Sequence, residues 1–231
     1  MKDYHLIIFD LDGTLLDTSE GILSSVRYTI DRFGFRELPE EVLRSFIGPP
    51  IQDSFSVAYG LEGPILQEIA TVFRDRYKST DLLKAKPYPG IFEALERLKS
   101  SGKRLAVATY KREDYALDIL RHFGFDRFFS VMHGGDHENR LKKPDIIRLC
   151  IDETEGANEE NSLLVGDTLS DSSGAEKVGI DFLGVSYGFG FRSPADASRI
   201  KCVGIAGSAS ETADYCLGQS EKKLVYDSKL C

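Results

Sequence analysis

A short apolar run near the start of the chain ends abruptly in charge. Residues 6–9 are apolar at every position, which is typical of a strand buried on both faces. Asp10 and Asp12 follow, with Gly13 and Thr14 after them. Because side chains i and i+2 of an extended chain point to the same side, we expect both carboxylates to face one small site. The alternative is an Asx turn that only closes the strand, since Asp-Gly is common in such turns.

Helical spacing of apolar residues then replaces the strand pattern. We predict a helix over residues 22–33 and two or three more over residues 39–46, 51–59 and 65–77. No strand pattern interrupts them. An all-helical stretch of this length, beginning just after a strand, predicts an inserted helical cap over residues 17–85. The core would then be discontinuous and comprise residues 1–16 and 86–231.

Strands and helices alternate from residue 91 onward. Strands are predicted over residues 104–109, 128–132, 162–165 and 181–185. Helices are predicted over residues 91–101, 112–123 and 169–178, and in the segment after Pro144. This alternation predicts an α/β fold, a doubly wound, Rossmann-like parallel sheet. Ligands of such sheets bind beyond the carboxyl ends of the strands, and Thr109, Asp167 and Asp171 lie at or after predicted strand ends.

Composition narrows the class of protein. The 231 residues are 42% hydrophobic and 29% charged, which argues against disorder, and no apolar run approaches the ~20 residues of a membrane span. The first residues leave no room for a signal peptide, so we expect a cytoplasmic protein. We expect it to be a monomer or a homodimer. A net charge of -8 makes nucleic acid a poor partner. The four cysteines have no metal-ligand spacing, and we expect His133 and His137 to be surface turn residues.

The acidic residues at the predicted strand ends favour a hard divalent cation. Asp10, Asp12, Asp167 and Asp171 offer only oxygen ligands, which suit Mg²⁺ better than Zn²⁺. A phosphate dianion could not enter so negative a site without cations, because two unit charges about 4 Å apart repel by about 4 kcal/mol at an effective dielectric constant near 20. Lys143, at the start of a predicted helix, is the best candidate for an additional positive charge, with Lys142 as the reserve.

These motifs, in this order, resemble the haloacid dehalogenase superfamily and specifically its phosphatase branch. They are Asp10-Leu-Asp12-Gly-Thr, then Thr109 after a strand, then Lys143, then Gly-Asp167 with Asp171. Three further segments, residues 48–55, 88–90 and 184–190, resemble the phosphoglycolate phosphatase-like group with a helical cap. Tyr110 stands where a small residue is usual, and the tail over residues 220–231 matches no pattern of this group.

The resemblance implies roles for individual residues. Asp10 would be the nucleophile, and Asp12 the general acid and base. Thr109 and Lys143 would hold the phosphoryl group. Further substrate or phosphate contacts would come from Gly13, Tyr110, Gly48 and Pro49. The implied metal ligands are Asp10, Asp167, Asp171 and the backbone carbonyl of Asp12.

The resemblance therefore implies a magnesium-dependent phosphomonoesterase that acts on a small phosphorylated metabolite through an aspartyl-phosphate. A phosphomutase, or a 5'-nucleotidase or pyrophosphatase of the same superfamily, remains an alternative. A phospho-ligand binding module without turnover is disfavoured, because such modules usually lose the nucleophile or the acid and both Asp10 and Asp12 are present here.

Overall fold

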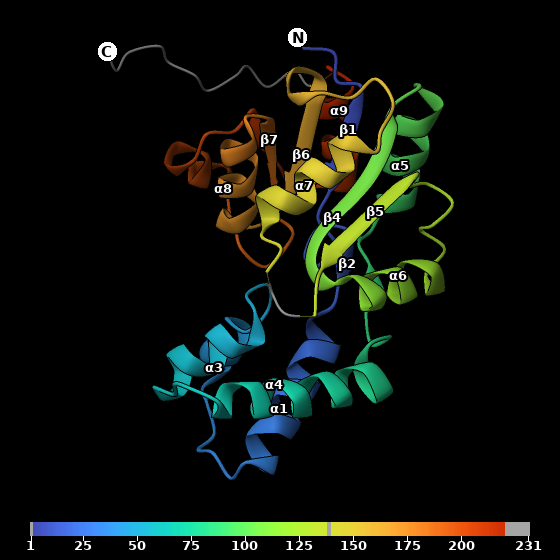
Figure 1. Cartoon of the computed structure of the whole chain (residues 1–231). Coiled ribbons are helices and arrows are strands. Elements are labelled where there is room, and N and C mark those ends of the chain that lie inside the picture. The colour runs from blue at the N-terminus through green and yellow to red at the C-terminus, as the bar shows by residue number, and fades with distance from the viewer. Residues whose placement is uncertain (1, 138–139, 220–231) are drawn as a thin grey trace.

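A six-stranded parallel sheet forms the centre of the computed structural model, which describes residues 2–137 and 140–219. The strand order is β5-β4-β1-β6-β7-β8 (Figure 1). The strands are β1 (Leu6–Phe9), β4 (Arg104–Arg112), β5 (Val131–Gly135), β6 (Ser162–Gly166), β7 (Asp181–Val185) and β8 (Gly204–Ala206). The helices that flank them are α5 (Ile91–Ser100), α6 (Glu113–His122), α7 (Lys143–Asp152), α8 (Leu169–Val178) and α9 (Ala209–Cys216). The predicted α/β class and doubly wound parallel sheet are confirmed.

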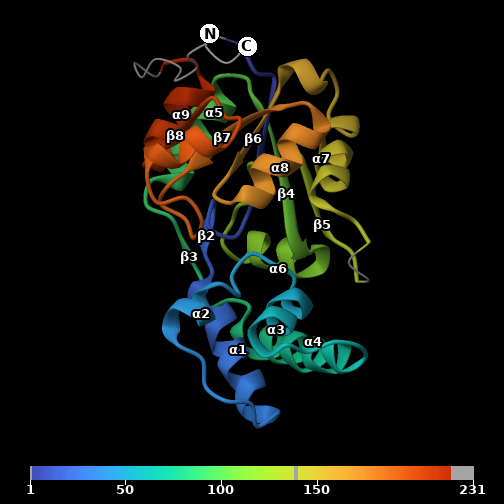
Figure 2. The same ribbon diagram turned by 90° about the vertical axis from the view of Figure 1, so that its left-hand side faces the viewer.

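Alternation along the strands builds two apolar layers. Ile7 and Phe9 of β1 belong to the buried cluster that contains the inner faces of α5, α6 and α9. Leu6 and Ile8 belong to the cluster that contains α7 and α8. Figure 2 shows α5 and α9 on one side of the sheet and α7 and α8 on the other. The apolar run of β1 therefore has no polar position because both of its faces are covered.

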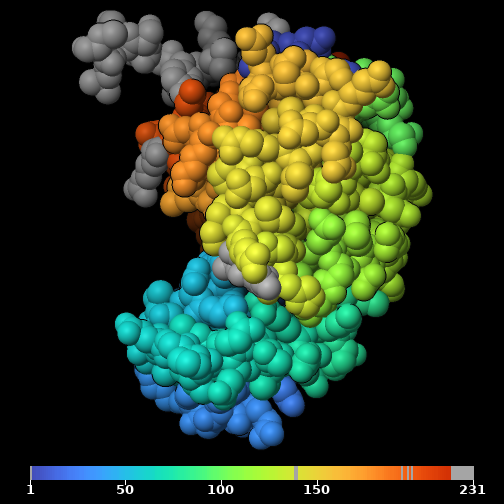
Figure 3. All heavy atoms as spheres, in the orientation of Figure 1, coloured from blue at the N-terminus to red at the C-terminus, as the bar shows by residue number. Residues whose placement is uncertain are grey.

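Four helices between the first and third strands of the chain form a separate group, which we call the helical segment. They are α1 (Ser19–Arg32), α2 (Glu40–Arg44), α3 (Ile51–Tyr59) and α4 (Ile65–Arg76), and a π-helical turn (Tyr77–Asp81) continues α4. Figures 1 and 2 show this group beneath the sheet. In the space-filling view of Figure 3, the molecule is narrower where the helical segment meets the rest of the molecule. A small antiparallel ribbon of β2 (Leu16–Asp17) and β3 (Lys86–Pro87) carries the chain in and out.

The helical segment has its own packing. Phe55 of α3 is fully buried and lies against the rings of Phe46, Phe35 and Tyr59. The buried carboxylate of Asp81 is satisfied by ion pairs with nearby cations and by a hydrogen bond from a serine hydroxyl of α1. Within the described part of the chain, none of the helices combines the length and the apolar character needed to cross a bilayer.

The structure corrects several predicted elements. Strand β5 spans Val131–Gly135, so the prediction of a strand over residues 128–132 is wrong. Phe128 and Phe129 are apolar because they pack from a loop against the rings of Phe92 and Phe9, respectively. Strand β4 continues three residues beyond Thr109, and β8 and α9 were not predicted. The tail over residues 220–231 lies outside the described residues.

Candidate active site

The ends of three adjacent strands bring the predicted site residues together. Phe9 of β1 is in register with Val107 of β4 and Val165 of β6, so the residues that follow these positions meet at one edge of the sheet. Asp10 and Asp167 directly follow β1 and β6, and Thr109 lies within β4, two residues after Val107. All three are buried. The site therefore lies at the carboxyl edge of the sheet, as predicted for a doubly wound fold.

Three carboxylates form a compact acidic triad. One oxygen each of Asp10, Asp167 and Asp171 lies within 4.8 Å of the other two, and all three residues are at least nine-tenths buried. Burial raises the pKa of Asp10 to about 7, and burial with the charges of Asp171 and Asp10 raises that of Asp167 to about 8. A bound cation would favour the ionised form of both groups. The oxygen donors, their spacing and their crowding fit a divalent ion of the Mg²⁺ type.

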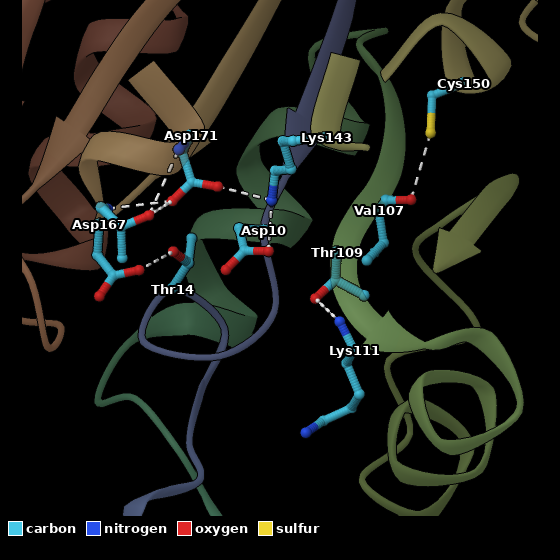
Figure 4. Close-up of polar contacts among 10 residues, drawn as sticks. Asp10, Thr14, Val107, Thr109, Lys111, Lys143, Cys150, Asp167 and Asp171 are labelled. Atoms are coloured by element: carbon cyan, nitrogen blue, oxygen red, sulfur yellow. Dashed lines mark hydrogen bonds and ion pairs between the residues drawn. The ribbon is translucent and has the colours of Figure 1, made fainter. Parts of the chain in front are cut away.

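Lys143 lies between two members of the triad. Its Nζ donates to Asp10 Oδ1 at 2.7 Å and pairs with Asp171 Oδ1 at 2.6 Å (Figure 4). Burial lowers the pKa of Lys143, but the two carboxylates outweigh burial and hold it above its usual value. Gly174 of α8 leaves room for this side chain, because a Cβ there would lie 2.7 Å from Lys143 Cγ. Lys142, the reserve candidate, is exposed and lines the cleft.

Asp167 and Asp171 are held by nearby backbone and hydroxyl groups. Asp167 Oδ2 accepts the N–H groups of Phe189 at 2.7 Å and Gly190 at 3.2 Å. Asp171 Oδ2 accepts both the N–H and the hydroxyl of Thr168. Thr168 is the N-cap of α8, so these contacts form a capping box at the start of that helix. Gly13 has a φ of 83°, and a Cβ there would lie 2.3 Å from Asp167 Oδ2. The turn after Asp12 can approach the triad only because Gly13 has no side chain.

Asp12 has partners that do not belong to the triad. Its Oδ1 accepts the hydroxyl of Thr18 at 2.6 Å and pairs with Lys111 Nζ at 3.0 Å. Lys111 also donates to the hydroxyl of Tyr77, at the end of α4, at 2.9 Å. Burial lowers the pKa of Lys111, but the charge of Asp12 and the contact with Tyr77 raise it above its usual value overall. Figure 4 shows the Lys111 side chain pointing away from Lys143.

Lys111 is a candidate that our sequence analysis missed. It lies two residues after Thr109 on β4, so alternation places the two side chains on the same side of the strand. That spacing was a usable signal. The predicted end of the strand at residue 109 concealed it, because a lysine beyond a strand end is ordinarily a solvated surface residue.

A cleft of about 640 Å³ opens over the triad. Tyr110 lines it from the core, and Gly48 and Pro49 line it from the loop before α3. Thr109 and Lys143 line the cleft as well, and Gly13 lies against Asp167 of the triad. Thr109 Oγ1 accepts the N–H of Lys111 at 3.2 Å.

His133 differs from its prediction. It lies within β5, half-buried, with Nδ1 3.2 Å from Glu113 Oε2 and Nε2 3.1 Å from Glu153 Oε2. The expectation of a surface turn is therefore wrong for His133, whereas His137 does lie in an exposed turn. Among the described residues, the acidic triad is the one group with metal-ligand geometry, and it contains no histidine.

The family of the chain follows from comparison with known proteins. Residues 7–185 match the model of the haloacid dehalogenase-like hydrolases. The chain belongs to this family, as its motifs predicted.

The chain is similar in sequence or fold to several named proteins. The chain is 40% identical to a 5'-nucleotidase of Pseudomonas aeruginosa, over 81% of this chain and 85% of that protein. It is 33% identical to the tyrosine-protein kinase PtkA of Mycobacterium tuberculosis, over 89% and 70% respectively. It is 32% identical to a phosphoglycolate phosphatase of Agrobacterium fabrum, over 80% and 81%. A predicted phosphatase from Clostridium acetobutylicum has the same fold, with a TM-score of 0.87, 31% identity and coverage of 94% and 100%. These relatives confirm the phosphoglycolate phosphatase-like group and a phosphatase enzyme.

Proposed function

We propose that this protein is a magnesium-dependent phosphomonoesterase that acts on a small phosphorylated metabolite. One observation carries the proposal. Asp10 and Asp12 are two positions apart, yet Asp10 lies in the triad with Lys143 whereas Asp12 pairs with Lys111 and Thr18. Two neighbouring carboxylates with separate partners can perform two different tasks, nucleophilic attack and proton transfer.

The triad would hold the metal. Asp10, Asp167 and Asp171 supply the carboxylate oxygens, and the backbone carbonyl of Asp12 completes the proposed set. When bound, Mg²⁺ would neutralise charge on the phosphoryl group during transfer. Lys143, which contacts Asp10 Oδ1 and Asp171 Oδ1, would contribute a further positive charge.

The first half of the reaction transfers the phosphoryl group to Asp10. A carboxylate oxygen of Asp10 attacks phosphorus as the bond to the leaving oxygen breaks, which gives an aspartyl-phosphate. Asp12 in its protonated form donates its proton to the leaving oxygen, so that an alcohol departs.

The second half restores the enzyme. Asp12, now ionised, accepts a proton from a water molecule whose oxygen attacks phosphorus. The bond between phosphorus and the Asp10 oxygen breaks, and inorganic phosphate and the Asp10 carboxylate are released. Thr109 and the backbone around Gly13 would donate to the phosphoryl oxygens in both halves.

We further propose that residues 17–85 act as a cap over a core of residues 1–16 and 86–231. Gly48 and Pro49 line the cleft from the loop before α3, which supports a role for them near the leaving group. Selectivity among phosphoesters would then depend on the cap, whereas the core would treat all phosphoryl groups alike. We also propose a cytoplasmic location, which agrees with the free thiols of the described cysteines.

The test is release of phosphate from a panel of small esters. The panel contains phosphoglycolate, nucleoside 5'-monophosphates, sugar phosphates, pyrophosphate and an aryl phosphate, each with Mg²⁺ and with excess chelator. We expect release that requires Mg²⁺ and is lost in Asp10→Asn, while Asp31→Asn, an exposed matched control on α1, retains wild-type rates.

Other outcomes would change the proposal. Full activity in chelator would contradict the metal assignment. Transfer of the phosphoryl group to a second sugar hydroxyl rather than to water would indicate a phosphomutase. Transfer from ATP to a tyrosine peptide, without hydrolysis of any monoester, would favour the activity for which PtkA is named.

A further inference from the structure

A side cavity of about 130 Å³ adjoins the cleft at the boundary between the helical segment and the sheet. The two cavities share part of their lining, including Gly48, Pro49, Tyr110 and Lys111. A ligand whose phosphoryl group lies at the triad could therefore extend into the side cavity. The side cavity has about one fifth of the volume of the cleft, so it suits one end of a ligand rather than the whole of it.

Arg74 of α4 contributes an uncompensated positive charge to this cavity. Its guanidinium is half-buried, and its Nη2 donates a hydrogen bond of 3.4 Å to Gln52 Oε1. Among the described residues no carboxylate lies within ion-pair distance of it, whereas Arg76, two positions later, pairs with buried Asp81. Partly burying a guanidinium without a carboxylate costs free energy, which an anionic ligand would recover.

A second guanidinium increases the local positive charge. Arg112, at the end of β4, also lines the side cavity and stacks over the ring of Tyr115 at 3.8 Å. Two hydrogen bonds, of 2.5 and 2.6 Å, engage Arg112 with Asp114. Burial, followed by the nearby charge of Arg112, lowers the pKa of Arg74. The two guanidinium groups thus repel each other, and an anion between the helical segment and the sheet would relieve this repulsion.

The other charged groups of the side cavity already have partners. Lys111 pairs with Asp12. Both oxygens of Asp136 accept backbone N–H groups, those of Arg140 at 2.9 Å and Leu141 at 3.0 Å. Tyr77 accepts a hydrogen bond from Lys111, the ion-pair partner of Asp12. Arg74 lies three residues before Tyr77, about one helical turn away on the same face.

We propose that the side cavity is a subsite for a second anionic group on the leaving group of the substrate, and that Arg74 binds this group. The substrate class is then phosphoesters whose alcohol ends in a carboxylate or a second phosphate. The proposal rests on the phosphomonoesterase function above and extends it. Esters with a neutral leaving group would be hydrolysed without this contact.

The experiment compares matched pairs of esters with wild-type enzyme and Mg²⁺. Phosphoglycolate is paired with 2-hydroxyethyl phosphate, which replaces the carboxylate by a neutral alcohol. Propane-1,3-diol bisphosphate is paired with 3-hydroxypropyl phosphate, which tests a second phosphate. We expect kcat/KM to be about 10- to 100-fold higher for the anionic member of at least one pair, chiefly through KM, since one charge-assisted contact is lost in the neutral member.

Two variants connect this preference to Arg74. Arg74→Ala should reduce the ratio of kcat/KM between anionic and neutral esters to nearly one, and Arg74→Lys should restore part of it. Arg32→Ala removes the same charge from an exposed position at the end of α1 and should retain the wild-type ratio. Because the readout is a ratio between two esters, a partly unfolded preparation changes both rates and leaves the ratio intact.

The outcomes separate this inference from the proposed function. Equal kcat/KM values within both pairs, or a ratio that survives Arg74→Ala, would overturn the subsite while leaving the phosphatase intact. A carboxylate preference and a bisphosphate preference would identify the two possible anions. No phosphate release from any ester with Mg²⁺ would overturn the proposed function and the subsite together.

Discussion

The two carboxylates that follow β1 belong to two differently built sides of one site. The triad side consists of Asp10, Lys143, Asp167 and Asp171, all from the sheet edge and the helices that follow it. The helical side consists of Asp12 and Lys111 from the core, with Tyr77 and Arg74 from α4. The first side is built from the sheet and its flanking helices alone, whereas the second is complete only where the helical segment meets the sheet. In the proposed mechanism, phosphoryl transfer to Asp10 depends on the core alone, whereas proton transfer by Asp12 and the choice of substrate also depend on contacts with the helical segment.

The largest effect should come from the nucleophile. Asp10→Asn replaces an attacking oxygen by an amide of the same shape, so we expect phosphate release to fall by at least about 10³-fold. The folded state should persist, because the amide also removes a negative charge from a crowded cluster. Steady-state phosphate release and thermal unfolding check both statements. Hydrolysis by a preparation free of wild-type enzyme would remove Asp10 from this role.

Lys143 should come next. Lys143→Met removes the cation that neutralises the triad, and we expect a decrease of about 10²- to 10³-fold in kcat. Without Mg²⁺ its melting temperature should also fall, because Asp10 and Asp171 lose their buried partner. Lys142→Met is the matched control and should stay within about threefold of wild type. Reversal of the two results would assign the phosphate contact to Lys142.

On the helical side, Lys111→Met should have a smaller effect. Lys111 contacts Asp12 rather than the triad, so we expect kcat to decrease by about 10- to 100-fold while the Mg²⁺ concentration for half-maximal activity stays near the wild-type value. A Mg²⁺ titration at saturating substrate separates these quantities. If the variant required far more Mg²⁺, the two sides of the site would not be independent.

The smallest effect concerns stability and pH in excess chelator. The pKa of Asp167 is raised to about 8 in the folded protein, so its contribution to stability is present at low pH and is lost as the pH rises through about 8. The amide of Asp167→Asn does not ionise, so the variant does not undergo this loss of stability at high pH. The melting temperature of the variant relative to wild type should therefore rise by a few degrees between about pH 5 and about pH 9.

Added Mg²⁺ provides the control for this measurement. A cation that binds the ionised triad stabilises the wild type more than Asp167→Asn, so it should shrink or reverse the difference at high pH. A difference in melting temperature that did not depend on pH or Mg²⁺ would contradict both the raised pKa of Asp167 and its role as a metal ligand.

The triad side could be predicted from sequence, but the helical side could not. Asp10 and Asp167 follow apolar strands, Asp171 lies in the helix after Asp167, and Lys143 precedes a proline at a helix start. Each is placed by local pattern together with the rule that parallel strands end at one edge. The side chain of Arg74, in contrast, reaches the site only through the packing of α4 against the core, which no local periodicity encodes.

The same contrast applies to the fold. Strands β1, β4, β6 and β7 of the sheet were predictable because they are apolar and bounded by turn residues. Strand β8 has only three residues, Gly204–Ala206, and it is recognisable only from its pairing with β7. Phe128 and Phe129 misled the prediction of β5 because two buried aromatic residues in a loop have the same local pattern as a short strand.

The division of labour between the two carboxylates can be tested most directly with Asp12→Asn and an aryl phosphate. An aryl oxide leaves without a proton donor, so the variant should still transfer the phosphoryl group to Asp10 but fail to activate water. We predict a burst of aryl alcohol of one equivalent per active site, no matching release of phosphate, and a phosphoryl group on the peptide that contains Asp10 after acid quenching and mass spectrometry. Equal and steady release of aryl alcohol and phosphate, or a phosphoryl group on another residue, would contradict the account.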